Sequence, residues 1–391
     1  MNQPIAPHTV AVAVSGGADS LKTLLLMKEQ GQDVFALHGV FFSFDDAGRE
    51  AEACRMRDRL AVCCQDAGVA LHIVDLRADF LQLVMRPFVQ AYAQGRTPNP
   101  CALCNAGIKF GLLLDAAVQR GAKKLATGHY AALLSDIRGE KDSQGMAVCG
   151  VSGGAESFPA LYQGADPARD QSYFLALVPG MALSKVVFPL ADKEKSGVLD
   201  DLERHGLAVP QPGESREVCF IDADSYQDVL PAMAQSMGIT LPGPGPMLLG
   251  DNTCLGTHKG LWRYTEGQRR GLGLGWKEPL HVLGKEPAAN VLRLGPRRDM
   301  RAKGCVCSGV NLLVSPQRWP ERVLVKTRYR ECPKEARAWL DMDNAGQVLR
   351  IRFMDPDSAL APGQVAALFA PGVFGNDRLR LLAGGIIENV E

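Results

Sequence analysis

The 391-residue chain lacks an excess of charge of either sign, because 43 Lys and Arg residues balance 43 Asp and Glu residues. Global charge therefore gives no indication of a polyanionic partner. The charge is unevenly spread, since residues 259–330 contain 16 basic and 5 acidic residues, a net charge of +11. A basic segment in a neutral protein can still guide a phosphate backbone.

The sequence also lacks the pattern of a signal peptide and long apolar runs. The opening residues, MNQPIAPHTV, have neither the basic nor the apolar region of a signal peptide, and no apolar run approaches the roughly 20 residues that cross a bilayer. We expect a cytoplasmic location and no membrane contact. The eleven cysteines are odd in number and scattered, which argues against a secreted disulfide framework and for reduced thiols.

Short apolar runs alternate with helical patterns in the first half of the chain. This βαβα order predicts a parallel sheet with helices on both faces. Further on, short alternating segments such as RVLVKTRYR, VLRIRFM and QVAALFA predict a small antiparallel β barrel or sandwich. The polar, Gly-rich residues 135–164 predict an exposed hairpin or loop. The expected strands are 9–14, 33–42, 69–76 and 123–130, and the expected helices are 20–30, 49–67, 80–94, 106–120, 192–205 and 225–237.

The segment SGGADS, residues 15–20, follows the first predicted strand and opens the first helix. Its glycines permit a tight turn with backbone N–H groups near a ligand, and the helix N-terminus favours a negative group such as phosphate. The segment is neither GxxxxGK[ST], because no Lys follows the second Gly, nor GxGxxG. Its form, SGGxDS, resembles the loop of enzymes that cleave ATP between the α and β phosphates. The alternative is an ordinary turn capped by Asp19 or Ser20.

Nine segments resemble one family in order and spacing, namely the bacterial tRNA-specific 2-thiouridylases, which convert the C2 oxygen of the wobble uridine of certain tRNAs to sulfur. Each short motif is weak alone, but the ordered set is specific. The segments are SGGADS (15–20), GRTPNPCALCNAGIKFG (95–111), ATGHYA (126–131), RDQSYFL (169–175), ESREVCFI (214–221), GTHKGLWRYTEGQRRGLGLG (256–275), KTRYRE (326–331), PGQ (362–364) and GGIIE (384–388).

The resemblance implies an α/β fold class with three parts. It places an adenine nucleotide α hydrolase-like (PP-loop) parallel-sheet domain at 1–222, a small central domain at 223–285, and a tRNA-contacting C-terminal antiparallel β barrel at 286–391. It implies ATP and Mg²⁺ as cofactors and the glutamate, glutamine and lysine tRNAs as partners. A sulfur-donor relay protein or a cysteine desulfurase would supply the sulfur.

Residue by residue, the resemblance implies Cys104 as the nucleophile and Cys219 as the persulfide carrier that returns as a disulfide partner. Asp19, in the phosphate loop, is expected to help hold a Mg²⁺ that bridges the phosphates, because hard cations take carboxylate oxygens. The implied nucleotide contacts are Ala13, Val14, Ser15, Gly16, Gly17, Ala18, Asp19, Ser20, Phe42 and Gly128. The implied tRNA contacts are Asn99, Pro100, Cys101, His129, Arg169, Asp170, Gln171, Arg328, Tyr329 and Gln364.

The chemistry of 2-thiolation requires parts of these kinds. Oxide is a poor leaving group, so ATP must first adenylate the C2 oxygen, which then departs as AMP. A thiol of pKa about 8.5 is only a few per cent thiolate at pH 7, so the sulfur nucleophile needs activation. One cysteine must carry the sulfur and a second must release it by forming a disulfide. The anticodon base must also be splayed out into the pocket.

The chain departs from the family at two places. Cys101 stands where the family has an aspartate three residues before the nucleophile, and Arg216 and Glu217 replace a small TG pair before the persulfide motif. Loss of the carboxylate puts an acid–base role at residue 101 in doubt. Two mechanisms stay open: a persulfide and disulfide cycle on Cys104 and Cys219, or a [4Fe–4S] cluster held by Cys101, Cys104 and Cys219 that passes on sulfide. A zinc clip is weaker, because only one CxxC pair is nearby.

Plainer interpretations also remain. In these interpretations Cys219 is a small buried hydrophobe and His129 is a satisfied histidine at a strand end. Two functions of other classes are kept as alternatives. One is a different PP-loop adenylating enzyme, such as an amide-forming ligase, which would not need Cys104 and Cys219. The other is a non-catalytic tRNA-binding protein with a metal-clipped loop, which would release no AMP.

Overall fold

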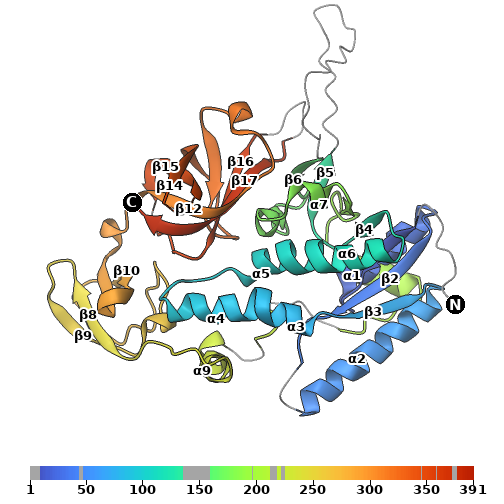
Figure 1. The fold of residues 1–391 in the computed structure, drawn as a ribbon, viewed down its shortest axis with the longest axis horizontal. Coiled ribbons are helices and arrows are strands. Elements are labelled where there is room, and N and C mark those ends of the chain that lie inside the picture. Colours follow the sequence, from blue (N-terminus) through green and yellow to red (C-terminus); the bar gives the residue numbers. More distant parts are fainter. Residues whose placement is uncertain are drawn as a thin grey trace, which may run out of the picture.

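The computed structural model describes residues 9–43, 47–134, 159–195, 197–211, 218–221, 225–344, 346–357, 359–371 and 377–391. Most of the loop predicted at 135–164 lies outside the described residues, as do Arg216 and Glu217. Figure 1 shows a parallel sheet with its helices near the N-terminus, a smaller sheet in the middle of the chain, and a larger curved sheet that contains the C-terminal strand.

The N-terminal sheet is parallel throughout, as the βαβα order predicts. Its five strands lie in the order β3-β2-β1-β4-β7, so the chain builds outward from β1 on one side and returns to the other side through β4. The central strand β1 is almost entirely buried, which agrees with its continuous apolar sequence. The strands are β1 (Val10–Ala13), β2 (Val34–Val40), β3 (Leu71–Asp75), β4 (Lys124–Ala126) and β7 (Val186–Val187).

Four of the six predicted helices lie within three residues of their expected positions. The helix predicted at 192–205 is shorter, because α8 begins only after Gly197, whose φ is +82°, and the helix predicted at 106–120 begins six residues earlier. Helix α1 packs its leucines into a core beneath the sheet and ends before Gly31, whose φ of +70° is the left-handed conformation that glycine adopts readily. The α-helices are α1 (Ala18–Glu29), α2 (Ala47–Asp66), α3 (Arg77–Phe80), α4 (Arg86–Ala93), α5 (Pro100–Leu103), α6 (Leu114–Gln119), α7 (Gly180–Leu183), α8 (Val198–Arg204) and α9 (Tyr226–Ser236).

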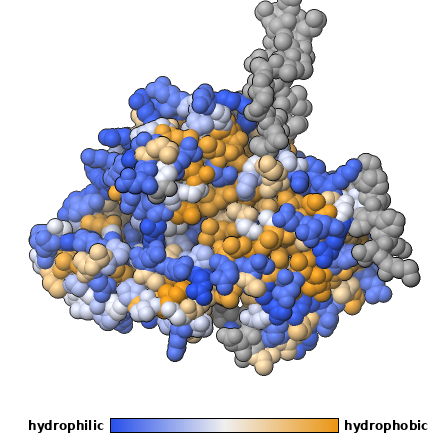
Figure 2. All heavy atoms as spheres, in the orientation of Figure 1, coloured by the Kyte–Doolittle hydropathy of each residue, from blue (hydrophilic) through white to orange (hydrophobic). Residues whose placement is uncertain are grey.

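Two wider, π-helical segments interrupt these helices. The segment η1 (Leu81–Met85) joins α3 to α4, and η2 (Cys104–Leu113) joins α5 to α6 into one helical run. The run Pro100–Gln119 has the length and composition of a membrane span, which tempers the expectation that no apolar run approaches that length. Its buried side chains pack in the main core, and core helices pass the same test. Figure 2 shows hydrophobic residues gathered over the centre of this face, where Figure 1 places α5 and α6.

Two antiparallel-rich sheets follow. The smaller has the order β10-β11-β8-β9 and spans residues 245–296, and the larger has the order β12-β15-β14-β13-β16-β17-β6-β5, with β12 also pairing with β17. The β12–β17 pairing closes six of these strands into the predicted barrel. The strands are β8 (Gly245–Leu249), β9 (Cys254–His258), β10 (Leu280–Glu286), β11 (Val291–Pro296), β12 (Ala302–Leu312), β13 (Val323–Lys326), β14 (Lys334–Asp343), β15 (Gly346–Asp357), β16 (Val365–Ala370) and β17 (Arg380–Val390).

A hairpin from the first half of the chain joins the barrel. Strands β5 (Ala131–Leu134) and β6 (Ala160–Gln163) pair with each other, and Tyr162 of β6 pairs with Arg380 of β17. The nucleotide-loop region and the barrel are therefore linked by a shared sheet. Because sheets do not delimit folding units, the divisions at 222 and 285 stay predictions. Short 3₁₀ turns complete the chain: η3 (Ser172–Leu175), η4 (Leu261–Arg263), η5 (Pro287–Ala289), η6 (Arg297–Asp299) and η7 (Pro316–Arg318).

Candidate functional site

The glycine loop lies directly after β1, as predicted. Gly16 has φ +89°, and a Cβ there would lie 2.8 Å from the Met56 sulfur, so glycine is required. Within the loop, the Ser20 hydroxyl donates to the Gly17 carbonyl at 2.8 Å and accepts from the Ser15 N–H at 3.1 Å. Gly17 precedes α1, and no side chain caps the helix start. The ordinary capped turn is therefore not what forms here, and the first turn from Ala18 is open to an anion.

The loop also lies at the topological switch point of the sheet. Strand β1 pairs with β2 on one side and β4 on the other, and the connections leave in opposite directions, which is where open α/β sheets bind ligands. Gly128 follows β4 and approaches the loop closely, since a Cβ there would lie 3.0 Å from the Asp19 carbonyl carbon and oxygen. Two segments that are distant in sequence thus meet at the predicted nucleotide site.

The other predicted nucleotide contacts frame this point. Ala13 ends β1, and Val14 follows with its N–H donating to the Leu37 carbonyl at 3.0 Å. The carbonyl of Val14 is 2.8 Å from His38 Nδ1, so the backbone of residue 14 is already engaged. Phe42 lies just beyond β2, with its ring 5.9 Å from that of Phe80.

Asp19 is held at the mouth of the loop by two residues from elsewhere in the chain. Its Oδ1 accepts the Tyr130 hydroxyl at 2.8 Å, and its Oδ2 lies 3.6 Å from Lys195 Nζ. Burial and the Asp19 carboxylate raise the pKa of Tyr130, so its phenol keeps its proton and remains a donor. A carboxylate oriented in this way suits a hard cation such as Mg²⁺.

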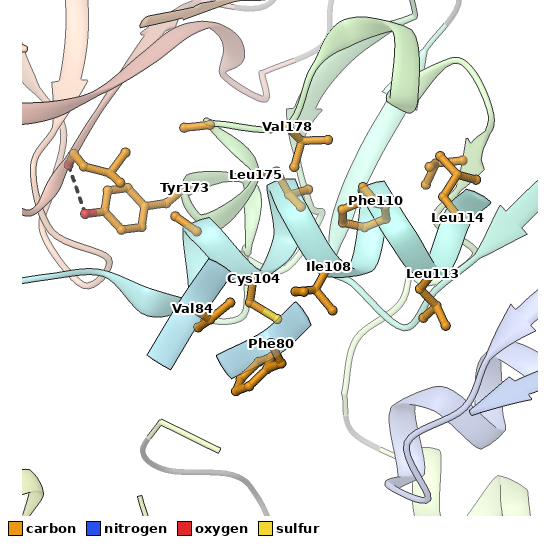
Figure 3. Close-up of a cluster of buried hydrophobic side chains, with 14 of the residues drawn as sticks. Phe80, Val84, Cys104, Ile108, Phe110, Leu113, Leu114, Tyr173, Leu175 and Val178 are labelled. Atoms are coloured by element: carbon orange, nitrogen blue, oxygen red, sulfur yellow. Dashed lines mark hydrogen bonds between the residues drawn. The ribbon is translucent and has the colours of Figure 1, made fainter. Parts of the chain in front are cut away.

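The CxxC pair begins the long helical run. Asn99 Oδ1 accepts the Ala102 N–H at 3.2 Å, and Pro100 occupies the first turn, so both residues act as helix-start signals. Cys101 is partly exposed, whereas Cys104 is buried, with 7% of its surface exposed. Figure 3 shows the Cys104 sulfur directed away from its helix, toward Phe80.

The three thiols lie within electrostatic range of one another. Burial raises the pKa of Cys104 to about 11, the Lys109 cation opposes the rise, and Cys101 adds to it. Burial also raises the pKa of Cys219 to about 12, and Cys104 and Cys101 raise it further. The Cys219 side chain reaches solvent, which tempers this shift. All three thiols are free and, at neutral pH, protonated in this state.

These thiols do not form a ready-made metal site. Among the residues that the structure describes, no three His, Cys, Asp or Glu side chains are grouped to hold a metal ion. Cys101, Cys104 and Cys219 thus do not supply the three converging ligands that a [4Fe–4S] cluster needs, and no second ligand pair for a zinc clip is found in the described part of the chain.

Several of the predicted tRNA contacts make hydrogen bonds within the protein itself. Asp170 is buried and accepts four hydrogen bonds, from Gln163 Nε2, the Gly164 N–H, and the Ser172 N–H and hydroxyl, at 2.8 to 3.1 Å. Gln171 Oε1 accepts the Tyr130 N–H at 3.1 Å. These bonds attach the 169–171 triplet to the strand that precedes it.

His129 and Arg169 differ sharply in exposure. His129 is buried beside Phe110 and Phe188, with Nδ1 2.8 Å from the Thr127 hydroxyl, and burial lowers its pKa well below the usual value. Its imidazole is therefore neutral. Arg169 is partly exposed, which suits a phosphate contact.

The three predicted contacts from the barrel each touch a different part of the chain. Arg328 Nη2 donates to the Glu266 carbonyl at 2.8 Å, and the Tyr329 ring lies 4.5 Å from that of Phe174. Gln364 Nε2 donates to the carbonyls of Thr97 and Pro98, at 3.0 and 3.2 Å. Of the three, Gln364 thus contacts the segment that precedes the cysteines, whereas Arg328 and Tyr329 contact other parts of the chain.

Sequence reasoning missed Lys195, Tyr130 and Lys109. Tyr130 and Lys109 lie inside quoted motifs, so their polar side chains beside His129 and Cys104 were available signals. Lys195 is one of several Lys and Glu residues in ADKEKSG, which carries no local pattern. Only the packing of α8 on α1, joined by an ion pair between Lys22 and Asp201, brings it to Asp19.

A glycine loop at the switch point of a parallel sheet, with β-rich lobes attached, defines a nucleotide-binding α/β protein with accessory β domains. Family models agree: residues 8–223 match the tRNA methyl transferase HUP domain, 240–296 the tRNA methyl transferase PRC-barrel domain, and 302–387 the aminomethyltransferase beta-barrel domain. The chain belongs to the tRNA-specific 2-thiouridylase family, as its full-length relatives establish.

Those relatives cover nearly the whole chain. The tRNA-specific 2-thiouridylase MnmA of Oleidesulfovibrio alaskensis is 46% identical over 97% of this chain and 99% of its own length. The protein of the same name from Lawsonia intracellularis is 41% identical over 97% and 99%. A solved structure, the predicted subunit of tRNA methyltransferase from Methanocaldococcus jannaschii, is 14% identical, covers 59% of this chain and 89% of its own, and has a TM-score of 0.28, too low to carry an argument.

Proposed function

We propose that this protein catalyses the ATP-dependent 2-thiolation of the wobble uridine of tRNA, acting in the cytoplasm. The observation that carries the proposal is the combination, in one α/β unit, of an open glycine loop at the switch point and an electrostatically coupled set of thiols at Cys101, Cys104 and Cys219. The full-length relatives are named for this reaction.

The first half-reaction uses the loop. Residues Ser15 to Ser20 would bind the phosphates of ATP through backbone N–H groups, with Gly128 leaving room beside the loop. Asp19 would hold Mg²⁺, which neutralises phosphate charge when bound. The C2 oxygen of the uridine attacks the α-phosphorus, pyrophosphate leaves, and an adenylated base results.

The second half-reaction uses the thiols. The terminal sulfur of a persulfide on Cys219 attacks C2 and displaces AMP, forming a C2–S–S–Cys219 adduct. The Cys104 thiolate then attacks the Cys219 sulfur, the adduct S–S bond breaks, and 2-thiouridine leaves with a Cys104–Cys219 disulfide behind it. An external dithiol must reduce that disulfide, and a persulfide donor such as a relay protein or cysteine desulfurase must reload Cys219. Because the Cys219 side chain is exposed, such a donor can reach it.

Cys101 is assigned the role of resolving thiol or spectator in this scheme. Its position three residues before Cys104 places it on the same helical turn. The iron–sulfur alternative remains the weaker proposal, because the thiols are not grouped as metal ligands in the described part of the chain. Substrate tRNAs are expected to be those for glutamate, glutamine and lysine.

The deciding experiment incubates the protein with unmodified tRNA, Mg-ATP and either a persulfide or a sulfide donor, followed by mass analysis of nucleosides. We expect 2-thiouridine with release of AMP and pyrophosphate, and loss of the product in Cys104→Ser and Cys219→Ser. No 2-thiouridine with either donor contradicts the proposal. Full activity in the double serine variant, with AMP release but without thiolation in either protein, indicates a different adenylating enzyme.

A further inference from the structure

The turn that precedes the cysteines is held by the two β-rich lobes. Thr97, in the middle of this turn, contacts both of them through its backbone and its hydroxyl. The turn leads through the Asn99 cap directly into the helix that carries Cys101 and Cys104. The position of the Cys104 helix thus depends on contacts made outside its own part of the chain.

Gln364 makes the most specific of these contacts. Its amide nitrogen donates to the carbonyl oxygens of Thr97 and Pro98, at 3.0 and 3.2 Å. Its amide oxygen lies 3.4 Å from the Tyr173 hydroxyl, which also donates to the Val365 carbonyl at 3.0 Å. The only side-chain donor of Gln364 is therefore used within the protein.

The backbone around Gln364 fits the same turn. The Thr97 N–H donates to the Pro362 carbonyl at 2.8 Å. Gly363 has φ +94°, and a Cβ there would lie 2.9 Å from the Thr97 carbonyl oxygen, so the chain approaches as closely as glycine permits. The PGQ motif is thus shaped to the turn.

Lys285, from the smaller sheet, also contacts the turn. Its ammonium donates to the Thr97 hydroxyl at 3.3 Å and to the Tyr264 carbonyl at 3.0 Å. It is paired with Glu266 at 3.4 Å, and both side chains are almost fully buried. A buried, paired cation has little freedom to move, so Lys285 holds the Thr97 hydroxyl in one position.

We propose that Gln364, supported by Lys285, is a positioning residue for Cys104: it fixes the 97–98 carbonyls and so the start of the helix that presents the thiol. This goes beyond the tRNA contact expected of Gln364 from the sequence. It rests on the proposed function in taking Cys104 as the reacting thiol. Displacement of a reacting group by about 1 Å costs up to about 100-fold in rate, so removal of the amide lowers turnover rather than RNA affinity.

The test uses the full chain with Gln364→Ala and Gln364→Asn, which keeps an amide that cannot reach. We expect kcat for tRNA thiolation to fall about tenfold or more with KM for tRNA within about twofold. Without RNA or ATP, we expect iodoacetamide to modify Cys104 at least about threefold faster, because loosening the turn frees the start of the helix that carries the thiol and lets that helix open more often. Lower turnover together with a more reactive thiol is not expected from loss of an RNA contact.

Gln347→Ala serves as the matched control, because Gln347 is exposed on β15 of the same barrel. Unchanged kcat and a raised tRNA KM in the Gln364 variants would overturn the inference and restore the RNA contact. An unchanged Cys104 alkylation rate in both variants would also overturn it. If wild-type protein thiolates no tRNA, the proposed function fails, whereas the alkylation measurement still decides whether Gln364 positions Cys104.

Discussion

Among single residues, Cys104 combines a nucleophilic group with an environment that keeps it protonated. Burial raises its pKa to about 11, and the thiolate is the reactive form. The reactive fraction should therefore grow about tenfold per pH unit between pH 7 and pH 10. We expect iodoacetamide labelling of Cys104 in the resting protein to rise with this slope, as measured by mass spectrometry of peptides.

Cys254 is the internal control for that experiment, because it is exposed in the same chain. It should be labelled well before Cys104 at pH 7. Equal labelling of the two cysteines at pH 7 would mean that the Cys104 thiol is already activated in the resting state. That outcome would mean that the Cys104 thiol is deprotonated in the free enzyme and does not need substrate binding for its activation.

Lys195 supplies a cation that the SGGADS loop itself lacks. Its ammonium lies 3.6 Å from Asp19 Oδ2, at the expected position of the ATP phosphates. We expect Lys195→Met to weaken Mg-ATP binding about tenfold or more, about 1.4 kcal/mol, and to leave AMP binding within about twofold. Lys195→Arg should retain most of the affinity. Calorimetry with each nucleotide measures both effects.

The neighbouring Lys193→Met removes an exposed charge from the same segment and is the matched control for Lys195. An equal loss of ATP and AMP affinity in Lys195→Met would show a general disturbance of the pocket, contradicting a phosphate contact. Loss of the same size in Lys193→Met would attribute the effect to long-range charge alone.

At this scale the sequence predicted residues inside contiguous motifs and missed those brought in by folding. Gly16, Asp19 and Cys104 were predictable because the loop and the CxxC pair are local patterns. Lys195 was not, since it reaches Asp19 only through the packing of α8 on α1. Asp170 was predicted as an RNA contact, yet it accepts four hydrogen bonds within the protein. Two come from Ser172, inside the same motif, and were available as a local signal, whereas those from Gln163 and Gly164 depend on how strand β6 leads into this turn.

Among the elements, the close approach of the β4 end to the start of α1 explains why residue 128 is glycine. A Cβ at this position would lie 3.0 Å from backbone atoms of Asp19. We expect Gly128→Ala to push the two segments apart, destabilise the protein by about 1 to 3 kcal/mol, and weaken ATP binding. Thermal unfolding and nucleotide titration measure the two consequences.

Gly243→Ala is the control for that variant, because no atom lies within 4 Å of a Cβ built there and its φ is not positive. Its unfolding temperature and its ATP affinity should match those of the wild type. If Gly128→Ala also matched the wild type in both measurements, α1 would have shifted without cost, and the close approach of residue 128 would not define the pocket.

Element types and order could be predicted well, whereas helix geometry and distant pairings could not. The predicted helix at 106–120 became a run from Pro100 to Gln119 because Asn99 and Pro100 start it earlier. Its middle is π-helical over Cys104–Leu113, which a period of 3.6 residues cannot signal. The pairing of β6 with β17 joins residues more than 200 positions apart, and no local pattern specifies such a partner.

On the scale of the whole molecule, the lobes meet around a buried ion pair. Glu266 and Lys285 are 3.4 Å apart with side chains 5% and 2% exposed, and Arg328 of the barrel donates to the Glu266 carbonyl. Burial raises the pKa of Glu266 and lowers that of Lys285, while each partner opposes the shift of the other. Removing either residue would leave the other charge buried and uncompensated.

The pair predicts a strong asymmetry between single and double substitutions. Lys285→Met strands the Glu266 carboxylate and should destabilise the chain by about 3 to 5 kcal/mol, whereas Lys285→Met with Glu266→Leu should recover most of the loss. Because the stranded carboxyl has a raised folded-state pKa, its cost is small when it is protonated and grows as pH rises. The deficit in urea unfolding should therefore be larger at pH 8 than at pH 5. A double variant as unstable as the single one, or a deficit independent of pH, would mean that Lys285 acts through its contact with Thr97 rather than through the charge of Glu266.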